Sequence, residues 1–187
     1  DAAVEGAMIS KYRNAGQTCV CANRIYVQDG VYDAFAAKLA EAVKGLKVGD
    51  GTHAGVTTGP LINADAVRKV QSHLKDAQDK GAKVLAGGKP HELGGFFFEP
   101  TILTDVDSSM LVAREETFGP LAAVIRFDTE EQALQIANDT PYGLAAYFYT
   151  RDVHRVWRVA HGLQAGIICI NEGAISNAAA PFGGVKE

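Results

Sequence analysis

Apolar residues recur along this chain in two patterns that alternate from one end to the other. Spacings of three and four residues indicate amphipathic helices, and short runs of β-branched and aromatic residues bounded by Gly, Pro or Asp indicate strands. The pattern predicts helices over Ala2 to about Asn14, Val31 to Leu46, Asn63 to about Lys80, Thr129 to Asn138 and Arg151 to His161. It predicts strands over Arg24 to Gln28, Lys83 to Leu85, Phe97 to Leu103, Leu121 to Phe127, Ala145 to Tyr149 and Gly166 to Asn171.

The alternation of strands with helices sets the expected fold class. It predicts an α/β fold with a largely parallel sheet covered by helices on both faces. Asn63 and Thr129 are expected to cap two of the helices, because their side-chain oxygens can accept hydrogen bonds from the amides of a first turn. Since no repeat and no low-complexity linker divides the chain, we expect one domain over residues 1–187.

Composition narrows the class of protein. A hydrophobic content of 47% with 21% charged residues is typical of a soluble globular domain. The net charge of −4 gives no electrostatic reason to expect nucleic acid or a membrane surface as a partner. No apolar run suits a membrane span and no signal peptide is apparent, so we expect a cytoplasmic protein. Three cysteines do not make a disulfide framework, and the scattered histidines predict no metal site.

The two ends of the sequence indicate that the chain is part of a longer protein. It begins at Asp1, without a methionine and within a helical pattern, and it closes at Glu187 just after a glycine-rich loop. We therefore expect that segments outside 1–187 complete any functional site.

The segment 14–21, Asn-Ala-Gly-Gln-Thr-Cys-Val-Cys, is the strongest candidate for chemistry. Gly16 can adopt backbone angles that other residues avoid, so a tight turn here would present the Cys19 thiol to a cavity. A thiolate attacks carbonyl carbon, and a cation such as Arg13 or Arg24 would favour it. The alternative is that Cys19 is a small buried apolar residue.

Two further segments are candidates, each with a structural alternative. The adjacent carboxylates of Glu115 and Glu116 stand before a Gly-Pro turn, which is either functional or a solvated surface turn. The glycine-rich loop 180–184 is either functional or a connector. The alternative for Arg13 is a place on the helix surface, which is usual for such an arginine. The glycine pairs of the chain lack the strand-loop-helix context that binds a pyrophosphate.

Four segments together resemble the aldehyde dehydrogenase superfamily, in this order along the chain. They are Gly-Gln-Thr-Cys-Val around Cys19, Glu-Glu-Thr-Phe-Gly-Pro at 115–120, Gly-Ile-Ile-Cys-Ile-Asn at 166–171 and Pro-Phe-Gly-Gly at 181–184. The resemblance implies the catalytic domain of that family, with a cofactor-binding domain and a C-terminal tail lying outside 1–187. More narrowly, residues 12–35 and 171–187 are similar to bacterial members that oxidise succinate semialdehyde to succinate.

The resemblance also implies a cofactor and the roles of four residues. Cys19 corresponds to the nucleophile that attacks the aldehyde, with NADP or NAD as the hydride acceptor. Glu116 corresponds to the carboxylate that binds the nicotinamide ribose, and Phe118 to an aromatic residue that packs near the nicotinamide. Lys69 corresponds to a helix lysine near the same ribose.

The substrate and the regulation are implied in the same way. Arg13 and Ser176 occupy the positions that bind the distal carboxylate of the substrate, and Phe182 the position of a pocket residue. Cys21 corresponds to a second thiol that forms a reversible disulfide with the nucleophile in some members. A small-molecule aldehyde is therefore the expected substrate, and the parent protein is expected to be a homo-oligomer, either a dimer or a tetramer.

Overall fold

A computed structural model gives the conformation of residues 1–175 and 177–187. The helices are α1 (Ala2–Tyr12), α2 (Tyr32–Lys44), α3 (Ala64–Asp79), α4 (Leu111–Arg114), α5 (Glu130–Asn138) and α6 (Val153–Gly162), and the 3-10 turns are η1 (Arg13–Gly16) and η2 (Asp29–Val31). The strands are β1 (Arg24–Gln28), β2 (Lys83–Ala86), β3 (Thr101–Thr104), β4 (Leu121–Phe127), β5 (Ala145–Phe148) and β6 (Ile167–Ile170).

The strands form two sheets. Four strands are hydrogen-bonded in the order β1-β4-β3-β2, and β5 pairs with β6 in a second sheet. All the pairs are parallel except β2 with β3. The exception has a simple cause, because no helix crosses back between β2 and β3, and parallel pairing needs such a crossover. The predicted largely parallel sheet is confirmed.

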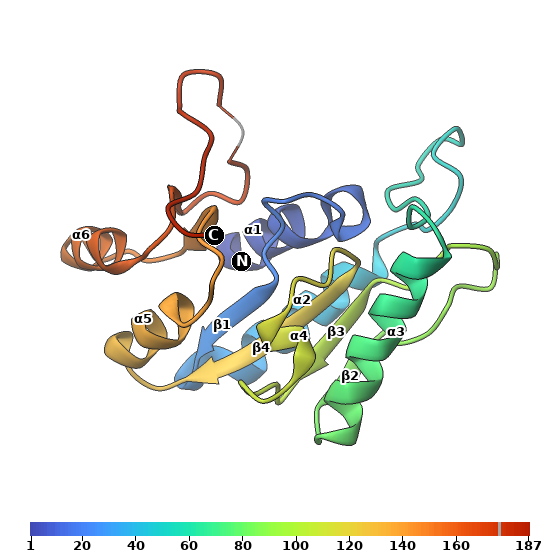
Figure 1. Ribbon diagram of the computed structural model, residues 1–187, viewed down its shortest axis with the longest axis horizontal. Coiled ribbons are helices and arrows are strands. Elements are labelled where there is room, and N and C mark those ends of the chain that lie inside the picture. The colour runs from blue at the N-terminus through green and yellow to red at the C-terminus, as the bar shows by residue number, and fades with distance from the viewer. Residues whose placement is uncertain (176) are drawn as a thin grey trace.

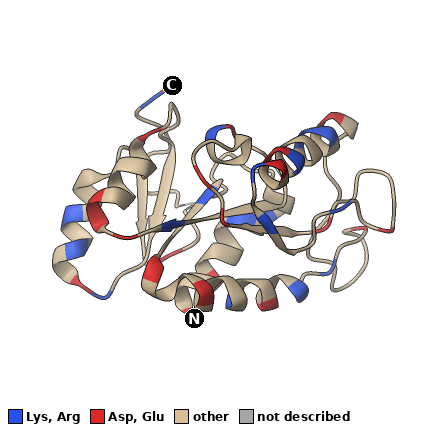
Figure 2. Cartoon of the chain, turned by 90° about the horizontal axis from the view of Figure 1, so that it is seen from below, with Lys and Arg blue, Asp and Glu red and all other residues tan. Residues whose placement is uncertain are grey.

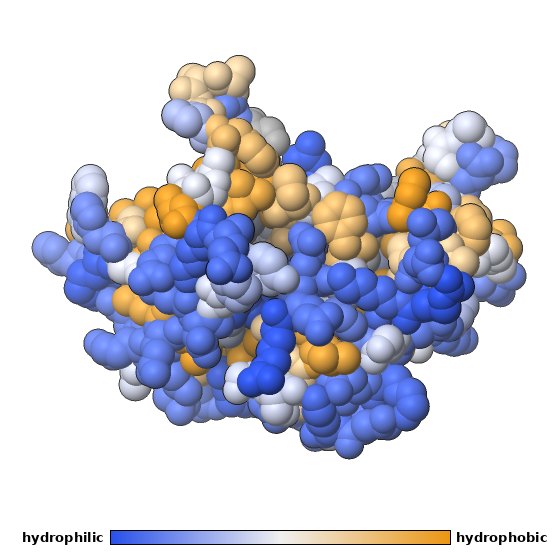
Figure 3. Space-filling view, viewed as in Figure 1, coloured by the Kyte–Doolittle hydropathy of each residue, from blue (hydrophilic) through white to orange (hydrophobic). Residues whose placement is uncertain are grey.

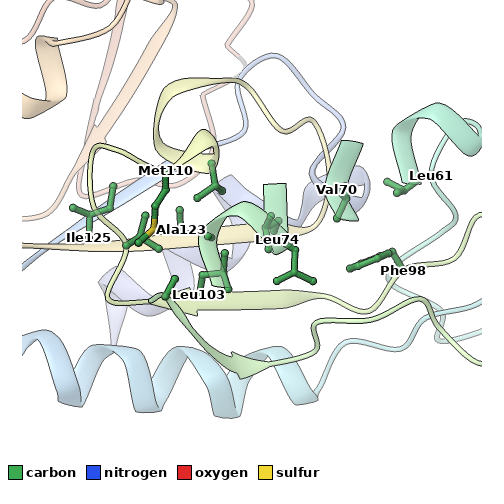
Figure 4. Close-up of a cluster of buried hydrophobic side chains, with 13 residues drawn as sticks. Leu61, Val70, Leu74, Phe98, Leu103, Met110, Ala123 and Ile125 are labelled. Atoms are coloured by element: carbon green, nitrogen blue, oxygen red, sulfur yellow. The ribbon is translucent and has the colours of Figure 1, made fainter. Parts of the chain in front are cut away.

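Helices cover both faces of the four-stranded sheet, and β4 shows why. Its side chains alternate between two apolar clusters, with Leu121, Ala123 and Ile125 in one and Ala122 and Val124 in the other. The first cluster packs under α3 and is drawn in Figure 4, and the second packs under α1 and α2. Figure 1 shows α1 and α2 on one side of the sheet and α3 on the other. This arrangement confirms the predicted layers.

Two predicted helix caps are confirmed. The side chain of Asn63 accepts a hydrogen bond from the amide of Ala66 at 2.9 Å, and that of Thr129 accepts one from Gln132 at 3.2 Å. Each bond satisfies an amide that has no partner inside its own helix. The first residues of α3 and α5 are therefore determined by side chains next to them in sequence.

The predicted strand over Phe97 to Leu103 is wrong in its first half. Strand β3 begins only at Thr101, because the preceding residues pair within their own loop. The amide of His91 donates to the Phe97 carbonyl, and the amide of Glu99 donates to the Lys89 carbonyl. The short helix α4 was not predicted either.

Side chains of β1 hold α5 in place and so bring the two sheets together. The Arg24 guanidinium donates to the carbonyls of Ile136 and Ala137 at 3.0 and 3.1 Å, and the Tyr26 hydroxyl also donates to Ile136 at 3.1 Å. These carbonyls lie in the last turn of α5, where they lack helical partners and where a positive charge is favoured. Strand β5 begins just beyond this anchored helix end.

Charged residues of both signs are interspersed over the helices, as Figure 2 shows. Apolar side chains also reach the surface around the base of the C-terminal loop in Figure 3. In sequence, Ile170 precedes this loop and Phe182 and Val185 lie near its end, and all three are exposed. Among the helices of the described residues, none has both the length and the hydropathy to cross a bilayer.

Candidate active site

A tight turn follows α1 and leads to the two thiols. Asn14, Ala15 and Gly16 all have positive φ, at 51°, 55° and 75°. A Cβ added to Gly16 would overlap the carbonyl oxygen of Gly119, so this position accepts only glycine without a backbone shift. The left-handed conformation costs roughly 1 kcal/mol for each of the other two residues. Strain of this kind persists only where the surroundings enforce it, which is common at functional sites.

Gln17 enforces the turn. Its side-chain amide donates to the carbonyls of Asn14 and Pro60, both at 3.2 Å, and its side-chain oxygen accepts from the amide of Ile62 at 2.9 Å. The Asn14 side chain donates in turn to the Gln17 carbonyl at 3.1 Å. The turn is thereby fixed to the loop that precedes α3.

Cys19 is exposed, whereas Cys21 is partly buried. The Cys21 sulfur lies 2.8 Å from the Thr18 hydroxyl and 3.6 Å from the Arg13 carbonyl oxygen. The described structure therefore does not match the alternative in which Cys19 is a buried apolar residue. Its role as a nucleophile stays a prediction.

A cavity of about 860 Å³ lies between β1 and β5, and every residue of both strands lines it. The open edges of the two sheets face this space, since β1 pairs with β4 and β5 pairs with β6. Cys19, Cys21 and Glu116 lie on its wall, so the fold brings together three of the predicted site residues. The thiol thus has access to a space large enough for a small-molecule substrate.

Arg13, Lys69, Phe118 and Phe182 lie outside that wall. Arg13 is exposed at the start of the thiol turn, and Lys69 is exposed on α3. Phe118 is 39% exposed and has a positive φ of 52°, and Phe182 is exposed in the C-terminal loop. Ser176 lies outside the described residues.

Asn23 fixes the loop 115–120, which carries Glu116 and Phe118. The Asn23 side chain donates to the carbonyls of Val112 and Glu115, at 3.0 and 2.9 Å, and accepts from the amide of Thr117 at 3.0 Å. Sequence analysis did not identify this residue. Its partners are about ninety residues away in sequence, so no local pattern indicates them.

Lys11 is a second residue that sequence analysis missed. It is 1% exposed on the last turn of α1. Burial lowers the pKa of Lys11 to about 8, an effect that the nearby Cys21 and Glu116 oppose. A cation is therefore held beside two groups of the site at a cost in stability.

The residues present fit one end of a nicotinamide cofactor. The exposed Glu116 carboxylate, on the cavity wall, can accept hydrogen bonds from ribose hydroxyls, and the exposed Phe118 ring offers an aromatic surface. The chain has no strand-associated glycine fingerprint for a pyrophosphate, so the fit concerns the nicotinamide and its ribose. Among the residues that the structure describes, no cluster of His, Cys, Asp and Glu could hold a metal ion.

Comparison with known proteins identifies related sequences. The model of the aldehyde dehydrogenase family matches residues 1–187. Glutarate-semialdehyde dehydrogenase of Pseudomonas aeruginosa is 65% identical over 186 residues, which cover 100% of this chain and 38% of that protein. The 3-sulfolactaldehyde dehydrogenase of Pseudomonas putida is 60% identical, with coverage of 100% and 38%. Succinate-semialdehyde dehydrogenase (NADP+) GabD of Escherichia coli is 62% identical, with coverage of 100% and 39%.

Solved structures agree with these matches. Succinate-semialdehyde dehydrogenase from Burkholderia pseudomallei superposes with a TM-score of 0.99 at 63% identity, over 100% of this chain and 39% of that chain. Betaine aldehyde dehydrogenase from Staphylococcus aureus in complex with NAD+ gives 0.94 at 39% identity, over 99% and 38%. The chain thus spans about 38% of the length of the curated relatives.

Replacing Lys11 by Met tests the cost of the buried cation. The lowered pKa corresponds to roughly 3 kcal/mol of lost stability at neutral pH. This loss is fully present below pH 8 and is relieved as the pH rises toward 10.5, where the unfolded chain also loses the proton. We expect Lys11→Met to raise the free energy of unfolding by about 1–3 kcal/mol at pH 7, with a smaller gain at pH 10.5. Urea titrations of this chain at both pH values measure it.

The exposed Lys44→Met variant is the control and should change little at either pH. An equal loss of stability in Lys11→Met at both pH values would contradict the prediction.

Proposed function

The chain belongs to the aldehyde dehydrogenase family, and on this premise we propose that it is the thiol-bearing catalytic domain of an NAD(P)-dependent enzyme that oxidises an aldehyde to an acid. The observation that carries the proposal is the exposed Cys19 thiol, which ends a strained turn on the wall of a cavity shared with Glu116. Because the chain spans about 38% of its relatives, we propose that polypeptide outside 1–187 supplies most of the cofactor site.

In the proposed reaction the Cys19 thiolate attacks the carbonyl carbon of the aldehyde. A carbon–sulfur bond forms, the carbonyl π bond breaks, and its electron pair moves to the oxygen. As the family resemblance implies, the Cys19 backbone amide would donate to this oxyanion. The carbonyl bond then re-forms as the former aldehyde hydrogen leaves the carbon as hydride, which gives a thioester on Cys19; NAD(P), when bound, would supply the hydride acceptor. Water then cleaves the thioester on Cys19, which releases the acid and regenerates the thiol.

An acid group at the far end of the aldehyde is proposed as the feature that the site recognises. Arg13 supports it, because this exposed residue begins the turn that leads to Cys19, and guanidinium donates strongly to carboxylates. The relatives named above are dehydrogenases of glutarate semialdehyde, 3-sulfolactaldehyde and succinate semialdehyde, all of which are acids. We propose succinate semialdehyde as the substrate and Ser176 as the second carboxylate donor, with Phe182 in the pocket. The 65% identity to a glutarate-semialdehyde dehydrogenase makes that longer aldehyde the alternative.

The surfaces around the site support an assembled enzyme, which we propose to be cytoplasmic. The open strand edges along the cavity and the exposed apolar side chains near the C-terminal loop are surfaces that other parts of a protein normally cover. We propose that the rest of the enzyme and further subunits of a dimer or tetramer cover them. The chain by itself is accordingly expected to be inactive.

Cys19→Ala tests the nucleophile in the full-length protein that carries this chain. Because the variant lacks the group that forms the covalent intermediate, NAD(P)-dependent oxidation of succinate semialdehyde should fall by at least about 10³-fold. Nicotinamide absorbance follows the rate. Cys169→Ala is the matched control, since Cys169 lies on β6 outside the cavity wall, and it should keep its activity. A Cys19→Ala enzyme with undiminished turnover would defeat the proposal.

Arg13→Gln tests the substrate class in the same protein. Losing a charge-assisted hydrogen bond to the distal carboxylate should raise KM for succinate semialdehyde by about tenfold or more and leave KM for butanal unchanged. Arg68→Gln, on the exposed face of α3, is the control that should alter neither value. Equal effects on both aldehydes would show that Arg13 does not recognise the carboxylate. Glutarate semialdehyde, assayed in parallel, decides between the two candidate substrates.

We further propose that Cys21 and Cys19 form a redox switch. Peroxide oxidises the Cys19 thiol to a sulfenic acid with release of water, and the Cys21 sulfur then displaces hydroxide, which leaves as water, to form a disulfide. Both sulfurs reach the same cavity, and the short loop between them favours a strained, reducible bond.

Mass analysis under mild peroxide tests the switch. The parent protein should lose two hydrogens per chain and regain full activity with dithiothreitol, whereas Cys21→Ala should progress to irreversible sulfinic acid on Cys19. Cys169→Ala should behave as the parent does. A Cys21→Ala protein that oxidises and recovers like the parent would remove the idea.

A further inference from the structure

We infer that His73 is a positioning residue for the nicotinamide-ribose end of the cofactor, because it holds the loop that presents Glu116 and Phe118. The inference rests on the cofactor roles proposed for those two residues. His73 belongs to neither the thiol turn nor the cavity wall. It lies on α3, one helical turn beyond Lys69, and it faces the loop 115–120.

Burial and contacts define its position. His73 is 2% exposed and Thr117 is 1% exposed, so both polar groups must satisfy each other. Imidazole Nδ1 lies 3.0 Å from the Thr117 hydroxyl, and Nε2 lies 3.5 Å from a carboxylate oxygen of Glu115. The two contacts flank Glu116 on either side in sequence, and Thr117 directly precedes Phe118.

The two contacts are compatible with a neutral ring. A neutral imidazole with its proton on Nε2 faces the Glu115 carboxylate with a donor and offers Nδ1 as acceptor to the Thr117 hydroxyl. Burial lowers the pKa of His73, and the positive charge of Lys69 acts in the same direction, while the negative charges of Glu115 and Asp76 oppose them. The neutral state therefore prevails at physiological pH.

Among the contacts within the described residues that hold the loop 115–120, the contact of His73 is the one that can change with protonation. The Asn23 side chain accepts a hydrogen bond from the Thr117 amide. Gly119 packs so closely against Val70 of α3 that a Cβ added to Gly119 would overlap the Val70 side chain. Neither support titrates. Within residues 1–175 and 177–187, the Thr117 hydroxyl has His73 as its sole hydrogen-bond partner.

Protonation of His73 would convert this acceptor into a donor. The Thr117 hydroxyl would then have to turn and direct its proton away from the ring within a buried space, which gives up the present hydrogen bond. We expect the loop to loosen and Glu116 and Phe118 to lose their alignment. The effect should appear in cofactor affinity and spare the thiol turn, which Gln17 fixes separately.

The test measures binding of NADP+ and NAD+ by calorimetry to the full-length protein that carries this chain. His73→Leu and Thr117→Val should each weaken the tighter-binding nucleotide about five- to tenfold, as expected for one buried hydrogen bond. The double variant should be no weaker than either single variant, because both remove the same bond. His73→Asn should stay within about twofold of the parent, since its amide oxygen can replace Nδ1 as acceptor.

A pH series adds a measurement that a merely structural role would not affect. Cofactor affinity of the parent should fall as the pH drops from 7.5 toward 5, and the decline should be smaller in His73→Asn, which cannot take up that proton. The rate at which iodoacetamide modifies Cys19 should stay the same in all variants. If His73→Leu does not fold, Thr117→Val and His73→Asn decide the question.

The outcomes separate this inference from the proposed function. A parent protein that binds neither nucleotide overturns the proposed function, and the inference with it. A parent that binds, with His73→Leu and Thr117→Val binding equally well, overturns the inference alone. Failure of His73→Asn to restore affinity, or an unchanged pH profile in that variant, also overturns it.

Discussion

The rest of the candidate site depends on the close approach of Gly16 to the carbonyl oxygen of Gly119. No side chain fits between them, so the thiol turn and the loop 115–120 lie in direct backbone contact. This contact joins residues about one hundred positions apart in sequence. It constrains the distance between the Cys19 thiol and the exposed groups of Glu116 and Phe118. Cys19 closely follows Gly16 in sequence, and Glu116 and Phe118 closely precede Gly119.

Both partners of the contact are held from outside. Gln17 fastens the thiol turn to the loop before α3, while His73 fastens the opposite loop to α3 and Asn23, the residue before β1, also holds it. The helix α3 and the loop that leads into it therefore hold one loop each. The apolar cluster beneath α3 makes that helix a rigid support, as its fully buried Val70 indicates.

Sequence patterns predicted the parts of this structure that local forces decide. The caps at Asn63 and Thr129 were predictable because each acts on an amide three residues away, and the layers followed from the alternating faces of strands such as β4. Cys19 stood out because Gly16 and its polar neighbours form a turn within a few residues. The roles of Asn23 and His73 depend on partners that only the fold brings near. The sequence offers one weak indication for His73: this polar residue occupies a position on the otherwise apolar face of α3.

The energetics of the site distinguish it from an ordinary packed core. Ala15 holds a left-handed conformation while buried, and Lys11 keeps an ammonium group almost without solvent beside Cys21 and Glu116. An alanine and a lysine in such settings lower stability, and an apolar side chain at position 11 would pack there without that penalty. The penalties fall within one short stretch that ends at the exposed thiol. The other helices and strands adopt the structures that their local sequences favour. A concentration of destabilising features at one place in such a fold is typical of a functional site.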